Sequence, residues 1–329
     1  MKPLQHPPTH SSQASHTRQR GAALLAAMLT VTLVATFAAS AMWQQWRGVE
    51  VEAAERSRVQ TAWLLTGALD WSRLILREDA RSGAVDHLAE PWAVPLQEAR
   101  LSSFLAFDKN SANDAQDAFL SGQITDLQSR LNVFNLAEGD KVSEPALKAF
   151  IKLFDLLGLP PAELSLLVRN LRLAHDTRAP TQADPLTPLP PQRVEQLVWL
   201  GLSPSTLSRL APHITLLPER TLVNLNTASA SVIYASIPAF EMGDAQRLVS
   251  ARARAHFRTL GDAGLAAAAL PDQLSVSSRF FEVRGRLRLE STTVEERSWL
   301  QRDGLDVKTL WRERSVANVL MSPPATSLQ

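Results

Sequence analysis

The sequence predicts an α+β protein that is carried on a long amino-terminal membrane helix and ends in an antiparallel sheet. Three patterns lead to this class. The stretch Ala22–Trp46 has no charged side chain, apolar residues recur at helical spacing from Pro145 to Ala174, and apolar and charged residues alternate from Phe281 to Leu289. The order along the chain is therefore a long helix, a little strand, a large helical block and then strands.

Length and composition exclude several classes of function. The chain has 329 residues, and its formal net charge of +1 gives no reason to expect nucleic acid or an anionic surface as a partner. It has no cysteine, which excludes a disulfide framework, a thiol nucleophile and a zinc–thiolate site. The sequence also has no phosphate loop, dinucleotide fingerprint or nucleophile elbow. We therefore expect a protein that is not an enzyme.

The amino-terminal apolar stretch is long enough to cross a membrane. About 20 apolar residues span the hydrocarbon core as a helix, and the uncharged stretch from Ala22 to Trp46 exceeds that length. Basic residues precede it, whereas Glu50, Glu52 and Glu55 follow it. The positive-inside rule therefore predicts a cytoplasmic amino terminus, with the bulk of the chain outside.

Three fates of this segment agree with the pattern. One is an ordinary signal anchor. Another is a secretory signal peptide cut after Ala39-Ser40-Ala41, which is disfavoured because the apolar run exceeds the roughly 7–15 residues of a signal-peptide core. The third starts from Arg20-Gly21-Ala22, where a basic leader ends in glycine directly against the apolar run. That arrangement is typical of prepilin peptidase substrates and predicts cleavage between Gly21 and Ala22.

The helix is predicted to continue beyond the membrane as far as Asp79. Apolar side chains keep helical spacing from Val59 to Leu76, with charged side chains on the other faces. The alternative is a pair of helices with a break near Gly48, since glycine weakens a helix by about 1 kcal/mol relative to alanine.

Beyond this stem we expect short strands and then helices. Leu101–Phe107 and Gly122–Asn132 have the composition of short strands, and Pro145–Ala174 is strongly helical. Five prolines make Arg178–Pro191 an exposed loop. The apolar stripe of the predicted helix consists of Leu147, Phe150, Ile151, Phe154 and Leu157.

Turn residues mark the connections between the later elements. Leu157–Leu164 is echoed by Leu200–Leu207, and in each a helix ends at glycine while the next begins with proline near its first position. Asp303-Gly304 is a hairpin-turn dipeptide between two alternating segments, Arg297–Leu300 and Val307–Arg314. The alternation predicts an antiparallel sheet with one wet face.

Six short blocks of sequence together resemble one known family. They are Arg20–Leu25, Leu76–Asp79, Asp86–Leu88, Glu90–Ala93, Ser121–Asn132 and Val223–Ala228. The family is protein K of the type II secretion system, also called general secretion pathway protein K, a large minor pseudopilin. The similarity extends from Arg18 to Arg314. It implies a pilin-like fold, with a long transmembrane helix, an antiparallel sheet and a large inserted all-helical domain of the SAM-like or helix-hairpin-helix-like kind.

The resemblance also implies how the chain is divided. The expected parts are a basic leader (1–21), a transmembrane helix (22–43), a periplasmic stem helix (44–79), the first part of the pilin-like domain (80–131), the inserted helical domain (132–270) and carboxy-terminal strands that complete the pilin-like domain (271–329).

Position five of the chain cleaved at this site is Ala26. Most pilins have glutamate there, which neutralises the free amine of the neighbouring subunit. A buried unpaired charge in lipid is costly, so that pairing stabilises the filament. Proteins of the K family lack the glutamate, which fits a subunit with no neighbour beyond it at the filament tip.

The function implied by the resemblance is that of a minor pseudopilin in the tip complex of the periplasmic pseudopilus, needed for export of folded exoproteins across the outer membrane. The implied location is the inner membrane, crossed once. The implied partners are the I, J and H types of minor pseudopilin, the major pseudopilin, prepilin peptidase and the inner-membrane secretion platform, with no nucleic acid among them.

Carboxylates raise the question of a metal at two places. Asp86, His87 and Glu90 form one group, which we interpret as a surface or capping cluster because no histidine pair at metal-binding spacing accompanies it. Calcium prefers carboxylate and carbonyl oxygens, and the resemblance implies a calcium-stabilised fold. The weak candidate calcium ligands are Asp108, Asp114 and Asp117.

The alternative function is a membrane-tethered periplasmic DNA receptor. Asn224–Arg258 is similar to a helix-hairpin-helix module, a unit that binds the DNA backbone in other proteins. Here the turn lacks the glycines that let backbone amides approach a phosphate, and Glu241 and Asp244 stand beside it. Packing is therefore the favoured use of this hairpin. Its candidate phosphate contacts are Arg247, Arg252, Arg254 and Arg258.

Overall fold

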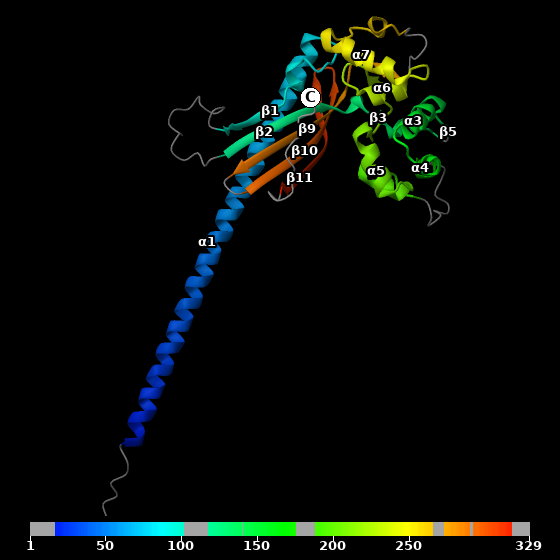
Figure 1. Cartoon of the computed structure of the whole chain (residues 1–329). Helices are drawn as coiled ribbons and strands as arrows, with labels where there is room; N and C mark the ends of the chain where they lie inside the picture. The colour runs from blue at the N-terminus through cyan, green and yellow to red at the C-terminus, as the bar shows by residue number, and fades with distance from the viewer. Residues whose placement is uncertain are drawn as a thin grey trace, which may run out of the picture. The chain divides into compact units, whose positions relative to one another are not determined.

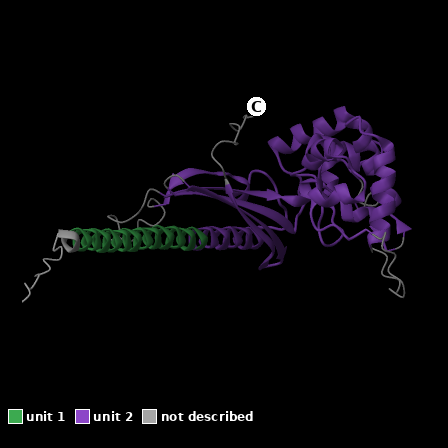
Figure 2. Cartoon of the chain, turned by 90° about the horizontal axis from the view of Figure 1, so that it is seen from below, with its two compact units in different colours: residues 1–62 green, residues 63–329 purple. Residues whose placement is uncertain are grey.

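The computed structural model describes residues 17–101, 118–139, 141–175, 188–265, 273–289 and 292–317. The chain divides into two compact units, Met1–Ala62 and Trp63–Gln329, which are coloured separately in Figure 2. The described part of the first unit consists of helix, and the second contains the sheet together with the remaining helices. Mixed helix and antiparallel sheet agree with the predicted α+β class.

The first helix, α1, runs from Thr17 to Ser82. It passes through Gly48 without a break, so the single long helix is confirmed and the pair of shorter helices is wrong. A hydrogen bond from the Gly83 amide to the carbonyl of Asp79 completes its last turn.

A five-stranded antiparallel sheet forms the centre of the second unit (Figure 1). In spatial order its strands are β1 (Leu96–Arg100), β2 (Ala118–Asp126), β9 (Phe280–Leu289), β10 (Thr292–Asp303) and β11 (Asp306–Ala317). The central strand, β9, therefore pairs with β2, a strand that lies far from it in the sequence.

The structure has a strand, β1, before the first predicted one, and the end of the second predicted strand differs. The predicted strand Leu101–Phe107 lies outside the described residues except for Leu101. The second ends at Asp126 rather than at Asn132, because the Asp126 carboxylate accepts a hydrogen bond from the Gln128 amide and starts a 3₁₀ turn.

One face of the sheet packs on the carboxyl-terminal part of α1. Phe281, Val283 and Leu287 of β9 alternate toward a core that contains Leu65 and Leu76 of the helix. Burying each such side chain contributes about 1.5–3 kcal/mol. The predicted alternation along β9 is therefore confirmed on this face.

The opposite face was expected to be wet, and at one end this is wrong. Phe280 and Glu282 point away from the helix, yet they are 0% and 1% exposed. Leu127 and Leu217, from the segments that lead into and through the helical block, cover Phe280. The alternation rule fails here because a second layer lies on the sheet.

Two glycines face each other in the sheet, and at one of them a side chain would be tight. Gly285 of β9 pairs with Gly122 of β2. A Cβ atom at Gly285 would lie 3.5 Å from Leu65 Cδ2, and one at Gly122 would lie 3.1 Å from the carbonyl oxygen of Arg284. A larger residue at Gly122 would therefore push the two strands apart.

A helical block occupies the sequence between β2 and β9, and it has its own large core. Its helices and 3₁₀ turns are η2 (Leu127–Ser129), η3 (Val133–Leu136), α3 (Glu144–Leu156), α4 (Pro161–His175), η4 (Val194–Leu200), α5 (Pro204–Leu210), η5 (Ala211–His213), α6 (Ala230–Ser236), α7 (Met242–Arg254) and η6 (Leu260–Ala263). Three short strand pairs tie them together: β3 (Leu131–Asn132) with β6 (Ile214–Thr215), β4 (Ala137–Glu138) with β5 (Lys141–Val142), and β7 (Val223–Asn224) with β8 (Leu274–Ser275).

The predicted helical stretch Pro145–Ala174 consists of two helices, α3 and α4, with the break where the glycine and proline turn was predicted. Gly158 has a φ of 56°, a left-handed conformation that ends α3, and Pro161 begins α4. Phe150 and Phe154 of the predicted stripe are buried, but Ile151 is 43% exposed and does not belong to it.

The turns predicted from sequence are confirmed where the structure describes them. Gly201 repeats the left-handed conformation with a φ of 107°, and Pro204 begins α5 as Pro161 begins α4. The β10–β11 hairpin turns at Gly304, whose φ is 59°. Of the predicted loop Arg178–Pro191, residues 188–191 have no regular structure and the rest lies outside the described residues.

Candidate functional site

A buried polar junction centres on Asp126, at the end of β2. Its Oδ2 accepts hydrogen bonds from the hydroxyls of Thr227 (2.5 Å) and Ser278 (2.6 Å) and from Asn224 Nδ2 (3.2 Å). Its Oδ1 accepts from the Gln128 amide at 2.7 Å. Asp126 is 2% exposed, so one carboxylate joins the sheet, the helical block and the segment before β9.

Arg302 of β10 forms the second half of the junction. Its guanidinium donates to Asp79 Oδ2 at 2.8 Å, to Asp86 Oδ1 and to the carbonyl oxygen of Ser278 at 2.9 Å. Asp86 Oδ2 in turn accepts from the Ser278 amide at 2.7 Å. One buried cation thus connects the end of α1, the following loop and the sheet.

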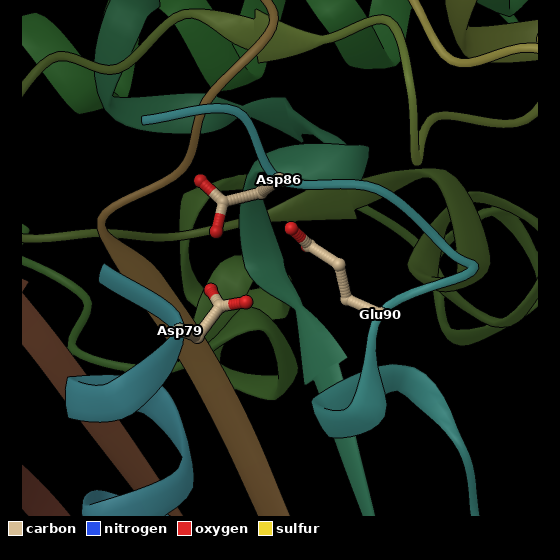
Figure 3. Close-up of side chains that lie close together, drawn as sticks. All are labelled: Asp79, Asp86 and Glu90. Atoms are coloured by element: carbon tan, nitrogen blue, oxygen red, sulfur yellow. The ribbon is translucent and has the colours of Figure 1, made fainter. Parts of the chain in front are cut away.

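Three carboxylates face one another at the end of α1, as Figure 3 shows for Asp79, Asp86 and Glu90. One oxygen of each lies within 4.8 Å of the other two, close enough to hold a metal ion. Two of the three already bind Arg302. Glu90 accepts hydrogen bonds from the His87 amide and from Trp92 Nε1. These contacts satisfy the group with protein donors, so the arrangement does not require a metal.

The interpretation of Asp86, His87 and Glu90 as a surface or capping cluster is therefore half right. Glu90 does cap the short loop that starts at His87, but Asp86 is 1% exposed and belongs to the buried junction. The residue that indicates the burial of Asp86, and that the sequence interpretation left out, is Arg302. It lies on the same side of β10 as Leu300, although a charge in an alternating strand is usually taken to be solvated.

Burial changes the acidity of the junction. It raises the pKa of Asp126 to about 6, against the hydrogen bonds from Ser278, Thr227 and Gln128. Burial also raises the pKa of Asp79 and Asp86, while the charge of Arg302 opposes the rise. The junction therefore holds its carboxylates at a desolvation cost.

The helix-hairpin-helix segment is held by a lysine from α3. Lys152 Nζ donates to the carbonyl oxygens of Ile237 and Phe240, each at 2.9 Å, and lies 4.0 Å from the centre of the Tyr234 ring. Of the arginines considered for phosphate binding, Arg252 donates to the backbone carbonyl of Leu225, and burial lowers its pKa to about 10. The hairpin is packed into the block, which gives the DNA-receptor alternative no support.

The predicted processing residues lie on the first unit. Gly21, Ala22 and Ala26 are exposed residues of α1. Among the described residues, α1 from Gly21 onward is the one helix that is long and apolar enough to cross a membrane, and we describe it as a single-pass anchor. The candidate calcium ligands Asp108, Asp114 and Asp117 fall outside the described residues.

A membrane helix that continues as a stem and packs on one face of an antiparallel sheet defines a pilin-like class of protein. Two family models, both described as type II secretion system protein K, match residues 129–219 and 223–279. Type II secretion system protein K of Pseudomonas aeruginosa is 28% identical over 266 residues, which cover 74% of this chain and 75% of the relative. The Klebsiella pneumoniae protein of the same name is 29% identical over 326 residues, with 87% and 94% covered.

A solved structure has the same fold. The crystal structure of the GspK-GspI-GspJ complex from the type 2 secretion system of enterotoxigenic Escherichia coli contains a chain that matches with a TM-score of 0.62 and 17% identity, over 80% of this chain and 98% of that one. Together these findings support the type II secretion system protein K family for this chain, and with it the role of a minor pseudopilin.

Proposed function

We propose that this chain is the tip subunit of the pseudopilus and acts, without catalysing a reaction, in the export of folded proteins across the outer membrane. The observation that supports this is the attachment of the helical block to the sheet by the buried contacts of Asp126 with Asn224 and Thr227. These contacts hold the block against the sheet. Repeated stacking of such subunits would make their blocks collide, whereas one copy at the end of a filament meets no such obstacle.

The residue at position five supports the same location. Cleavage before Ala22 would leave Ala26 where a carboxylate otherwise neutralises the neighbour's amine. Without that carboxylate, a further subunit would bring an unpaired charge into lipid. Addition beyond this subunit is therefore disfavoured.

The helical block, residues 132–270, is best explained as an insertion into a pilin-like domain made of residues 80–131 and 271–329. The two ends of the proposed insertion lie beside each other, since Asp126 Oδ2 and Ser278 Oγ are 2.6 Å apart. A second contact joins the loop after α1 to the block, where the rings of His87 and His256 stack with 3.8 Å between their centres. When the two ends of an inserted domain lie close together, the insertion does not disturb the host sheet.

We further propose that prepilin peptidase cuts between Gly21 and Ala22, removing the leader (1–21) and leaving a transmembrane helix (22–43) and a periplasmic stem (44–79) in the inner membrane. Mass spectrometry of the mature amino terminus should find methylated Ala22. An intact leader, or a terminus at Met42, would contradict this. Gly21→Leu should remain uncleaved, because the peptidase needs a small residue before the cut.

The partners we propose are the minor pseudopilins of types I, J and H, the major pseudopilin and the secretion platform. The similar GspK chain was solved in complex with GspI and GspJ. On this chain an apolar groove of about 670 Å³ lies between the stem and β1 and β2. Trp63 and Trp71 stand exposed on the stem at this groove, at 72% and 63%. An apolar face of a partner's helix would bury them.

Photo-cross-linking tests this partner surface and the function together. A cross-linking residue at Trp71 should capture a minor pseudopilin in secreting cells, and loss of the protein should impair secretion. The matched control is Trp199, exposed on the helical block at 56%, where no pseudopilin stem should be captured. Equal capture of pseudopilin stems at both positions, or normal secretion without the protein, would contradict the proposal.

For a cofactor we propose calcium, bound near Asp108, Asp114 and Asp117. Carboxylates are suitable ligands for this ion, and the resemblance is the only support. Chelation with EGTA should lower the melting temperature of the protein, and added calcium should restore it. An unchanged melting temperature would contradict calcium binding there.

A further inference from the structure

A second pocket lies on the opposite face of the sheet from the stem. It has a volume of about 680 Å³ and is bounded by strands β9 to β11 on one side and by the 3₁₀ turns η4 and η5 on the other. Two half-buried indoles, Trp299 and Trp311, line it with ring centres 5.6 Å apart. Arg193 lies over the Trp311 ring at 4.6 Å.

Three further guanidiniums converge on a single carboxylate at the inner end of this pocket. Glu282, whose side chain is 2% exposed, binds Arg284 and, at 3.0 Å, Arg297. Desolvation would raise the pKa of Glu282, but the charges of Arg284 and Arg297 lower it. The carboxylate is therefore ionised and already satisfied by two cations.

The third guanidinium, Arg130, has no such partner. It is half-buried, and it makes no hydrogen bond or ion pair with any residue that the structure describes. Burial lowers the pKa of Arg130. The charge of Glu282 opposes this, and the charges of Arg284 and Arg297 act in the same direction as burial. In addition, Arg297 Nε is buried without a hydrogen-bond partner in the described part of the chain. An unpaired cation and an unused donor in a partly desolvated place carry a cost.

We propose that this pocket binds a carboxylate carried by a partner polypeptide, with Arg130 as its main contact and the two indoles receiving an adjacent apolar side chain. A carboxylate at Arg130 would neutralise the surplus charge through charge-assisted hydrogen bonds. Arginine and tryptophan are also the residue types that dominate binding at protein interfaces.

The acidic residues of the pocket favour a single carboxylate over a phosphate. Glu313 is paired with Arg193 at 3.1 Å, and Glu195 also lines the cavity. Four arginines thus face three glutamates, which leaves room for about one negative charge. A doubly charged anion would be repelled by the two outer glutamates. The proposal does not depend on a position at the filament tip, since it concerns only the second unit.

Binding of two matched peptides to the full chain in detergent micelles tests the proposal. The probes are N-acetyl-Glu-Phe-amide and N-acetyl-Gln-Phe-amide, with inorganic phosphate as the free-anion arm, measured by isothermal titration calorimetry. The glutamyl peptide should bind at least about tenfold more tightly than the glutaminyl peptide and than phosphate, because a charge-assisted contact contributes that much or more. Equal binding of the two peptides, tighter binding of phosphate, or no binding of the glutamyl peptide would overturn the proposal.

Two variants locate the site. Arg130→Gln should weaken binding of the glutamyl peptide about tenfold or more, whereas Arg169→Gln, an exposed position on α4, should leave it unchanged. Without peptide, Arg130→Gln should melt at the same temperature as the wild type or above it, because it removes an unpaired charge. A lower melting temperature for Arg130→Gln would mean that the arginine serves the fold alone, and that result would also overturn the proposal.

Discussion

Two clusters of buried charge in the second unit, the junction and the pocket, differ in how their cations are satisfied. At the junction a single guanidinium, Arg302, binds both Asp79 and Asp86. In the pocket, three guanidiniums surround the one carboxylate of Glu282, and Arg130 is left over. Each charged group of the junction is hydrogen-bonded within the chain and belongs to the fold, whereas Arg130, a cation with no such partner among the described residues, indicates what a binding partner would supply. The comparison therefore distinguishes residues that stabilise the fold from residues that are available to bind a ligand.

The largest expected effect follows from removing the one cation of the junction. Arg302→Met leaves Asp79 and Asp86 buried without a counter-charge, which typically costs about 3–5 kcal/mol. Urea unfolding of the full chain in detergent micelles, followed by tryptophan fluorescence, would measure this. The control is Arg279→Met, whose ion pairs with Glu219 and Asp303 are half exposed and should contribute less than about 1 kcal/mol. Similar losses of unfolding free energy in the two variants would contradict a special role for Arg302.

The junction should also make stability depend on pH. The pKa of Asp126 is raised from 3.8 to about 6, so the folded state binds more protons than the unfolded state between these values. The free energy of unfolding should therefore fall as the pH rises from about 4 to about 6, by about 3 kcal/mol for this group.

The Asp126→Asn variant isolates that dependence. It removes the titrating group, so its unfolding free energy should vary less between pH 4 and 6 than that of the wild type. Asp155→Asn, at an exposed position of α3, should keep the wild-type slope. A stability that rises through this pH range in the wild type would show that Asp126 is ionised at low cost.

Removing a cation that is bound by neutral carbonyl oxygens should cost less stability than Arg302→Met and more than a change in the pocket. Lys152→Met loses the hydrogen bonds to the carbonyls of Ile237 and Phe240 and the contact with the Tyr234 ring. We expect a loss of about 1–3 kcal/mol in the same urea experiment. Lys148→Met, exposed on the same helix, should cost almost nothing. No difference between the two lysine variants would mean that the turn of the hairpin is held by its apolar contacts alone.

The smallest effect is expected where cations are redundant. Arg284→Gln leaves Glu282 bound to Arg297 and close to Arg130, so the carboxylate stays neutralised. Stability should change by less than about 1 kcal/mol. A loss as large as that of Arg302→Met would show that the pocket charges form a closed set after all, and would remove the distinction on which the binding proposal depends.

Features set by neighbouring residues could be predicted from the sequence. The long helix, the glycine and proline turns at Gly158 and Gly201, and the inward face of β9 follow from composition and spacing within a few residues. The predictions of exposure were wrong where the helical block covers the sheet as a second layer. The face of β9 that carries Glu282 was expected to be wet because nothing local indicates that the helical block covers it.

The junction could not be predicted, because its partners are remote in sequence. Arg302 lies 223 and 216 residues from Asp79 and Asp86, and no pattern along one strand indicates such a contact. The blocks that carried the family resemblance did contain most of the site, since they include Asp79, Asp86, Asp126 and Asn224. These blocks contain the residues of the tertiary contact, but they do not indicate which of those residues contact one another.

The central claim is that this minor pseudopilin occupies one end of the pseudopilus, because its helical block is fixed to the sheet and Ala26 offers no carboxylate to a further subunit. The direct test is to label the helical block at Arg169, exposed on α4, and to count and locate the label on assembled filaments by electron microscopy. The account predicts one label per filament, always at the same end. Labels distributed along the shaft would contradict it, even if secretion still failed without the protein.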